Sequence, residues 1–115
     1  MIRLVIVDDM PDIRNYLAEE LAAASEQFSV VGAAEDGTEA VKLVDSLLPD
    51  VVLMDIQMKT RTEGIYAIRI IHERHPDIKC IALTIHEDDE LIFQAYLAGA
   101  ADYIIKTRSI DTIKN

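Results

Sequence analysis

The stretch IRLVIVDD, residues 2–9, places a mostly branched apolar run directly before two aspartates. A short apolar run that ends at polar residues is typical of a strand buried on both faces. The same pattern recurs four times along the chain, at Phe28–Ala33, Val51–Met54, Ile78–Leu83 and Tyr103–Ile105. The sequence therefore predicts five buried strands.

Segments of helical period lie between these strands. Ile13, Leu17 and Leu21 follow one another at intervals of four, with Pro11 suited to the first helical turn. Later segments of the same kind predict helices around Ala40–Leu48, Ile65–Ile71 and Asp88–Ala98, and a fifth helix that starts after Ser109. The fifth helix would have only about six residues before the chain ends.

The alternation of strands and helices predicts an α/β domain. Continuous apolar strands separated by helices indicate a parallel sheet covered on both faces. Right-handed crossovers make such a sheet open and doubly wound. Five strands of this length suit the flavodoxin-like order 2-1-3-4-5 with a truncated helix 5, an order that follows from size and class and not from periodicity.

Composition limits the function classes. The 115 residues suit one domain, half of them are hydrophobic, and the formal net charge is −10. Such an acidic domain is not expected to bind nucleic acid by itself, because phosphate backbones are bound by Lys and Arg. The sequence has no apolar run of about 18 residues, no signal peptide and only one cysteine, Cys80. We therefore expect a cytoplasmic protein without membrane contact or disulfide.

The residues at the strand ends carry the predicted chemistry. Asp8 and Asp9 follow the first strand, Asp55 the third, Thr84 the fourth and Lys106 the fifth. In the predicted order the first and third strands are neighbours, so three carboxylates would meet in one pocket. Two unit charges 4 Å apart repel by about 4 kcal/mol at an effective dielectric constant of 20, and one lysine cannot offset three carboxylates. Oxygen ligands without Cys or clustered His favour Mg²⁺ (or Mn²⁺) over zinc.

A carboxylate in such a pocket can act as a nucleophile and become an aspartyl phosphate. Phosphoryl transfer requires little from a protein beyond positioning and charge stabilisation. The Lys106 ammonium and the Thr84 hydroxyl are suited to contact the phosphoryl oxygens. The sequence therefore predicts phosphoryl transfer to Asp55.

Four motifs in this order resemble the receiver domains of response regulators in two-component signalling. They are Val7-Asp8-Asp9, Leu53-Met54-Asp55-Ile56-Gln57-Met58, Ala82-Leu83-Thr84, and Gly99-Ala100-Ala101-Asp102-Tyr103-Ile104-Ile105-Lys106. The resemblance covers essentially the whole chain, residues 1–115. The stretch 83–88 is most similar to receivers that precede a LuxR-type helix-turn-helix output domain.

The resemblance implies a role for each acidic residue. Asp55 would accept the phosphoryl group from a sensor histidine kinase. Asp9 would bind Mg²⁺ directly and Asp8 mainly through water, while the backbone carbonyl of Gln57 would complete the protein ligands.

The resemblance also implies which residues change conformation after phosphorylation. Thr84 and Tyr103 would be coupled switch residues, and Lys106 would pair with the phosphoryl group. The domain would then be a switch and not an enzyme. The output, transcription regulation through a DNA-binding domain, would lie beyond residue 115.

Three features depart from the family pattern. Lys59–Gly64 lacks the usual proline and is one residue longer, and Thr107 replaces a proline, so we expect a trans peptide after Lys106. The short fifth helix leaves little apolar cover, essentially Ile110 and Ile113. We therefore expect a fragment of a longer regulator that forms homodimers through the side made by helices 1 and 5.

Alternative functions are less well matched. A Mg²⁺-dependent phosphatase of the haloacid-dehalogenase type would place an Asp-x-Asp pair after its first strand, whereas this chain has Asp8-Asp9. An FMN carrier would need a hydroxyl-rich phosphate loop there. A stand-alone receiver that acts only by protein–protein interaction remains the main alternative.

Overall fold

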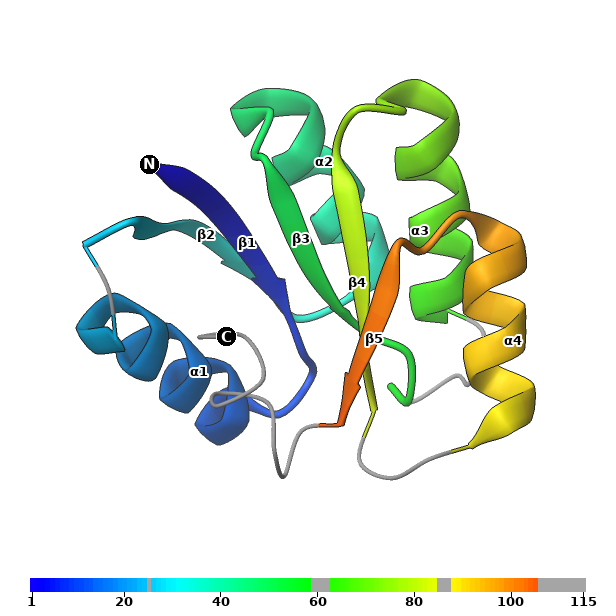
Figure 1. Cartoon of the computed structure of the whole chain (residues 1–115), viewed down its shortest axis with the longest axis horizontal. Helices are drawn as coiled ribbons and strands as arrows, with labels where there is room; N and C mark the ends of the chain where they lie inside the picture. The colour runs from blue at the N-terminus through cyan, green and yellow to red at the C-terminus, as the bar shows by residue number, and fades with distance from the viewer. Residues whose placement is uncertain (25, 59–62, 85–87, 106–115) are drawn as a thin grey trace.

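The computed structural model describes residues 1–24, 26–58, 63–84 and 88–105. Strands and helices alternate along this part of the chain (Figure 1). The strands are β1 (Ile2–Val7), β2 (Phe28–Ala34), β3 (Val51–Asp55), β4 (Lys79–Thr84) and β5 (Asp102–Ile105). The helices are α1 (Pro11–Ala24), α2 (Gly37–Leu47), α3 (Glu63–Arg74) and α4 (Asp89–Ala98). The predicted fifth helix lies outside the described residues.

The five strands form one parallel sheet in the order β2-β1-β3-β4-β5. This order confirms the predicted flavodoxin-like topology. The strand boundaries require a small correction, because Asp55 and Thr84 are the last residues of β3 and β4 and do not follow them. The β3–β4 ladder continues through the pair Asp55 and Leu83, so backbone hydrogen bonding extends the strands past the apolar runs.

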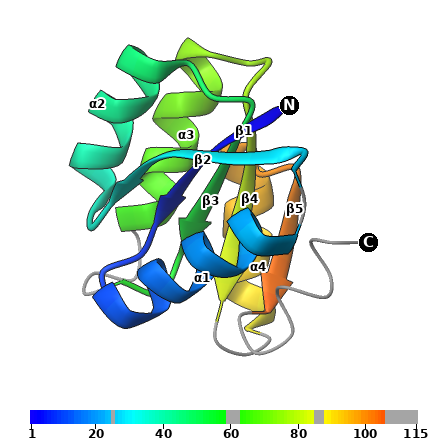
Figure 2. The same ribbon diagram turned by 90° about the vertical axis from the view of Figure 1, so that its left-hand side faces the viewer.

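Helices cover both faces of the sheet. α1 lies on one face, and α2, α3 and α4 lie on the other (Figures 1 and 2). Successive strand residues alternate between the two cores: Val5 and Val7 pack on the α2–α4 side, whereas Leu4 and Ile6 pack on the α1 side. Burial on both faces explains why the inner strands β1, β3 and β4 are mostly apolar.

Specific residues cap the starts and ends of α2 and α4. The Asp36 side chain accepts a hydrogen bond from the Glu39 N–H (2.8 Å) and caps α2, and Asp88 caps α4 in the same way. α4 ends at Gly99, whose φ of 118° lies in the left-handed region. A Cβ at Gly99 would come within 2.5 Å of the His72 ring, so this turn requires glycine on both grounds.

Cys80 lies in the core, as its place within an apolar strand predicts. Burial raises the pKa of its thiol to about 12. The thiol therefore stays protonated and acts as a small apolar side chain.

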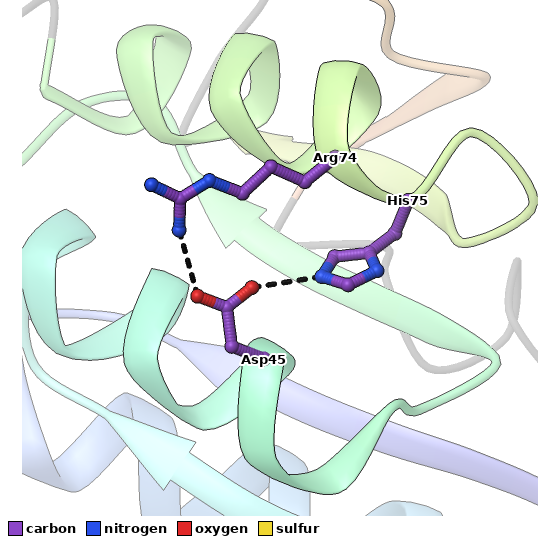
Figure 3. A network of polar contacts seen from close by, with 3 residues as sticks. All are labelled: Asp45, Arg74 and His75. Carbon is purple, nitrogen blue, oxygen red and sulfur yellow. Dashed lines mark hydrogen bonds and ion pairs between the residues drawn. The ribbon is translucent and has the colours of Figure 1, made fainter.

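A polar network joins the C-terminal ends of α2 and α3 (Figure 3). The Asp45 carboxylate accepts a hydrogen bond from Arg74 (Nη1, 2.7 Å) and lies 2.8 Å from Nε2 of His75. The hydrogen bond with His75 and the positive charge of Arg74 lower the pKa of Asp45 from its ordinary value of 3.8. The network therefore favours the ionised carboxylate.

α3 starts very close to the end of β3. Gly64, its second residue, lies against the backbone carbonyl of Asp55, and a Cβ at this position would overlap that oxygen. Because the contacted atom belongs to the backbone, it cannot move aside as a flexible side chain could. The small size of Gly64 thus sets how near α3 approaches the strand end.

None of the helices in the described ranges is long and apolar enough to span a membrane.

We predict that Asp45→Asn lowers stability in a pH-dependent way. The folded-state pKa of Asp45 is depressed, so its contribution is fully present above 3.8 and disappears as the pH falls through the folded-state value. Urea unfolding should therefore separate the variant from the parent at neutral pH, and the two curves should converge in acid. Asp77→Asn removes an exposed carboxylate for which no ion pair is seen among the described residues, and serves as the charge-matched control. A gap that persists in acid would contradict the prediction.

We predict that Gly64→Ala destabilises the domain even though alanine is the better helix former. Helix propensity would favour alanine by up to about 1 kcal/mol, whereas overpacking costs about 1–3 kcal/mol. Gly32→Ala is the control, because its Cβ would meet side-chain atoms and no backbone, the nearest being the flexible end of Leu47 at 3.0 Å. Chemical denaturation should show a lower free energy of unfolding for Gly64→Ala than for Gly32→Ala, and the reverse order would be inconsistent with the packing.

Candidate functional site

Three carboxylates meet at one end of the sheet. One oxygen from each of Asp8, Asp9 and Asp55 lies within 4.8 Å of the others. Asp8 and Asp55 are almost fully buried (0% and 1% exposed), and Asp9 is half-buried. The β1–β3 ladder pairs Val7 with Met54, so the two strands end at the same level and bring their acidic residues together.

Backbone hydrogen bonds orient two of these carboxylates. Oδ1 of Asp55 accepts a hydrogen bond from the Gln57 N–H at 2.8 Å, and Oδ1 of Asp8 accepts one from the Met10 N–H at 2.9 Å. Both contacts reach the backbone two residues further on, an arrangement that aspartate readily makes in turns. The Arg14 guanidinium donates to the backbone carbonyl of Asp8 (2.8 Å) and ties the start of α1 to the same loop.

Thr84 and Tyr103 lie on the neighbouring strands. Thr84 is fully buried at the end of β4, beside the end of β3. Tyr103 is half-buried and pairs with Ala82, two residues before Thr84. Because side chains alternate along a strand, Thr84 and Tyr103 point to the same face of the sheet, the one covered by α2, α3 and α4.

Lys106 and Thr107 lie outside the described residues, as does most of the stretch Lys59–Gly64. The proposed contact of Lys106 with a phosphoryl group and the trans peptide after it therefore stay predictions. The structure places the other predicted site residues, Asp8, Asp9, Asp55, Gln57, Thr84 and Tyr103, at the carboxyl edge of the sheet or on β5 beside it.

An acidic cavity of about 250 Å³ adjoins Asp9. Its lining residues are Asp9, Glu35, Asp36, Met58 and Glu63. Glu63, the first residue of α3, also accepts a hydrogen bond from the N–H of Gly37, the first residue of α2 (2.9 Å). The sequence placed Glu63 in the Lys59–Gly64 loop, whereas the structure starts α3 at this residue and so brings its side chain to α2.

The carboxylate cluster can hold a divalent cation. Its ligand atoms are all oxygens, which suit hard cations such as Mg²⁺, and neither His nor Cys belongs to the group. The cluster is buried at its base, so its charges repel in surroundings less polar than water. The charge and the ligand type of Asp8, Asp9 and Asp55 therefore both suit a divalent cation.

Known proteins are similar to this chain in sequence and in fold. The family model described as the response regulator receiver domain matches residues 4–115. The transcriptional regulatory protein DegU of Brevibacillus brevis is 38% identical over 112 residues, which cover 97% of this chain and 47% of DegU. The response regulator GacA of Pseudomonas viridiflava is 41% identical over 106 residues, which cover 92% of this chain and 49% of GacA.

Among solved structures, the signal receiver domain of NarL from Mycobacterium tuberculosis superposes with a TM-score of 0.86 at 28% identity. The match covers 97% of this chain and 92% of that domain. This chain spans about half the length of the two relatives above. Since the family match takes in almost all of its residues, the chain belongs to the response regulator receiver domain family.

Proposed function

We propose that this receiver domain takes a phosphoryl group from a sensor histidine kinase onto Asp55. The observation that carries the proposal is the meeting of Asp8, Asp9 and Asp55 within 4.8 Å at the carboxyl edge of the sheet. Ligands of open α/β sheets bind at this edge. Of the three, Asp55 stands at the end of the central strand, beside both β1 and β4.

The donor set fits Mg²⁺ or Mn²⁺. Asp9 and Asp55 would bind the ion directly, Asp8 mainly through water, and the backbone carbonyl of Gln57 would complete the protein ligands. When bound, the ion neutralises negative charge on the carboxylates and on phosphoryl oxygens. The Met10 N–H orients the Asp8 carboxylate and Arg14 holds the Asp8 carbonyl, so contacts within the chain fix this side of the site.

In the transfer step, a carboxylate oxygen of Asp55 attacks the phosphorus of a phosphohistidine. A P–O bond forms as the P–N bond breaks, and the imidazole nitrogen keeps the electron pair and takes up a proton. The hydrogen bond from the Gln57 backbone N–H holds the Asp55 carboxylate in one orientation for this attack. The Thr84 hydroxyl and the Lys106 ammonium would donate to phosphoryl oxygens.

The phosphoryl group would act as a switch. It adds up to about two negative charges and strong acceptor oxygens to a buried site. Thr84 would move toward these oxygens, and Tyr103 would then take the space that Thr84 leaves. Their placement on one face of adjacent strands supports this coupling.

We propose transcription regulation as the output, through a helix-turn-helix domain that is not part of this chain. The similarity to DegU, a transcriptional regulatory protein, supports it. The receiver matches along residues 4–115 also favour a phosphoacceptor over the phosphatase alternative. A receiver that acts only by binding proteins stays the second candidate, and self-association through helices 1 and 5 stays a prediction.

We predict that Asp55→Asn abolishes phosphorylation. Incubation of the parent with acetyl phosphate and Mg²⁺ should add one phosphoryl group, measured by intact mass, because Asp55 supplies the nucleophile. The amide of the variant has the same shape but is not a nucleophile of this kind. Asp12→Asn, in the first turn of α1, serves as the control and should be labelled like the parent. Equal labelling of Asp55→Asn and the parent would rule out Asp55 as the acceptor.

We predict that Asp9→Ala weakens Mg²⁺ binding by at least about tenfold, or about 1.4 kcal/mol. Asp12→Ala removes the same charge from the exposed first turn of α1 and should change the affinity by less than about twofold, because exposed charges are screened. The chain has no tryptophan, so calorimetry is the suitable measurement. Equal losses in the two variants would indicate a general charge effect and no direct ligand.

A further inference from the structure

The end of α4 contacts Tyr103 through a second tyrosine. The rings of Tyr96 and Tyr103 have centroids 6.4 Å apart and meet edge to face at 88°. Aromatic pairs attract one another in this geometry, because the positive edge of one ring faces the negative surface of the other.

Both tyrosines also share one acceptor. Oδ1 of Asp102 accepts a hydrogen bond from the Tyr103 N–H at 2.8 Å and one from the Tyr96 hydroxyl at 3.4 Å. The ordinary pKa of tyrosine, 10.0, already keeps the hydroxyl protonated at neutral pH, and partial burial and the nearby Asp102 charge raise the pKa of Tyr96 further. The side chain of Tyr96 is therefore held at two points, by a ring and by a carboxylate, and both belong to β5.

The backbone at Tyr96 is fixed by the turn that follows it. The Gly99 N–H donates to the Tyr96 carbonyl at 3.0 Å, and the left-handed Gly99 packs against His72. The outer face of α4 beside Tyr96 is apolar and exposed. We call Phe93, Tyr96 and Leu97, which are 58%, 43% and 63% exposed, the α4 patch. Tyr96 thus belongs both to this exposed patch and to the contact with Tyr103.

We propose that Tyr96 is a positioning residue that holds Tyr103 in its observed place in the unphosphorylated domain. Tyr103 then moves only when its contact with Tyr96 breaks, and the α4 patch changes in the same step. The inference rests on the proposed function, since it assumes that phosphorylation of Asp55 moves Tyr103. It adds a residue outside the acceptor site that sets how easily the switch operates.

A contact made in only one of two arrangements shifts the equilibrium toward that arrangement. Removal of the Tyr96 ring should therefore raise the fraction of molecules already in the phosphorylated arrangement, and with it the apparent affinity for a phosphoryl mimic. An aromatic pair of this kind accounts for an increase of about two- to tenfold.

The test is a titration of the Mg²⁺-loaded domain with beryllofluoride, a phosphoryl mimic, followed by nuclear magnetic resonance. The amide signal of Gln57 reports binding beside Asp55, and the ring signals of Tyr103 report the switch. Tyr96→Ala should bind the mimic about two- to tenfold more tightly than the parent. Tyr96→Phe keeps the ring and loses the hydroxyl, so it should show a smaller increase.

Two control variants separate this role from a general effect of surface change. Tyr66→Ala removes an exposed tyrosine from α3 (60% exposed), and Leu97→Ala removes a member of the α4 patch that does not enter the ring pair. Neither should alter the affinity for beryllofluoride. Urea unfolding of each variant measures any loss of stability, which a purely structural role of Tyr96 would produce without tighter binding.

The outcomes are distinct. Unchanged or weaker affinity in Tyr96→Ala, or an equal gain in Tyr66→Ala, would overturn the role of Tyr96. If Tyr96→Ala does not fold, Tyr96→Phe and Asp102→Asn carry the test, and unchanged affinity in both would overturn it as well. No response of the Gln57 amide in the parent would instead contradict the proposed function itself, whatever the Tyr96 variants do.

Discussion

The repulsion among Asp8, Asp9 and Asp55 is the constraint on which the rest of the site depends. Their backbones are fixed by the β1–β3 ladder and by loop hydrogen bonds, so the charges cannot move apart while the sheet is intact. Burial of Asp8 and Asp55 removes much of the solvent that would screen them. The fold therefore holds a concentration of negative charge that favours the binding of positive charge, which is the property that a metal-assisted phosphoacceptor needs.

The fold was predictable because both faces of its sheet are buried. The buried strands are therefore mostly apolar runs, and such runs are visible without knowledge of their neighbours. The exact ends were not visible. Asp55 and Thr84 are polar and mark the end of an apolar run, yet each remains the last residue of its strand, because pairing depends on the backbone and not on side-chain polarity. The order of the strands in the sheet followed from the fold class, doubly wound α/β.

The site was predictable only where it depends on strand ends. Asp8, Asp9, Asp55 and Thr84 could be placed together because parallel strands carry their last residues to one edge. Glu63 and Tyr96 depend on how helices pack, α3 against α2 and α4 against β5, and that information is not local in sequence. On its own, an acid at a helix start or a tyrosine on a helix surface looks like ordinary solvent-facing chemistry.

The packing around Asp55 differs between its two sides, and this difference would give the proposed switch a direction. On the α3 side, Gly64 leaves no space beside the Asp55 carbonyl, and Glu63 and Asp45 connect α3 to both ends of α2. On the other side, β5 is a four-residue edge strand, and Tyr103 is held there by a ring contact and a shared carboxylate. A tightly packed contact resists displacement, whereas a strand with a neighbouring strand on only one side of the described sheet moves at lower cost. Charge added at Asp55 should therefore be relieved by movement toward β5 and α4, away from α2 and α3.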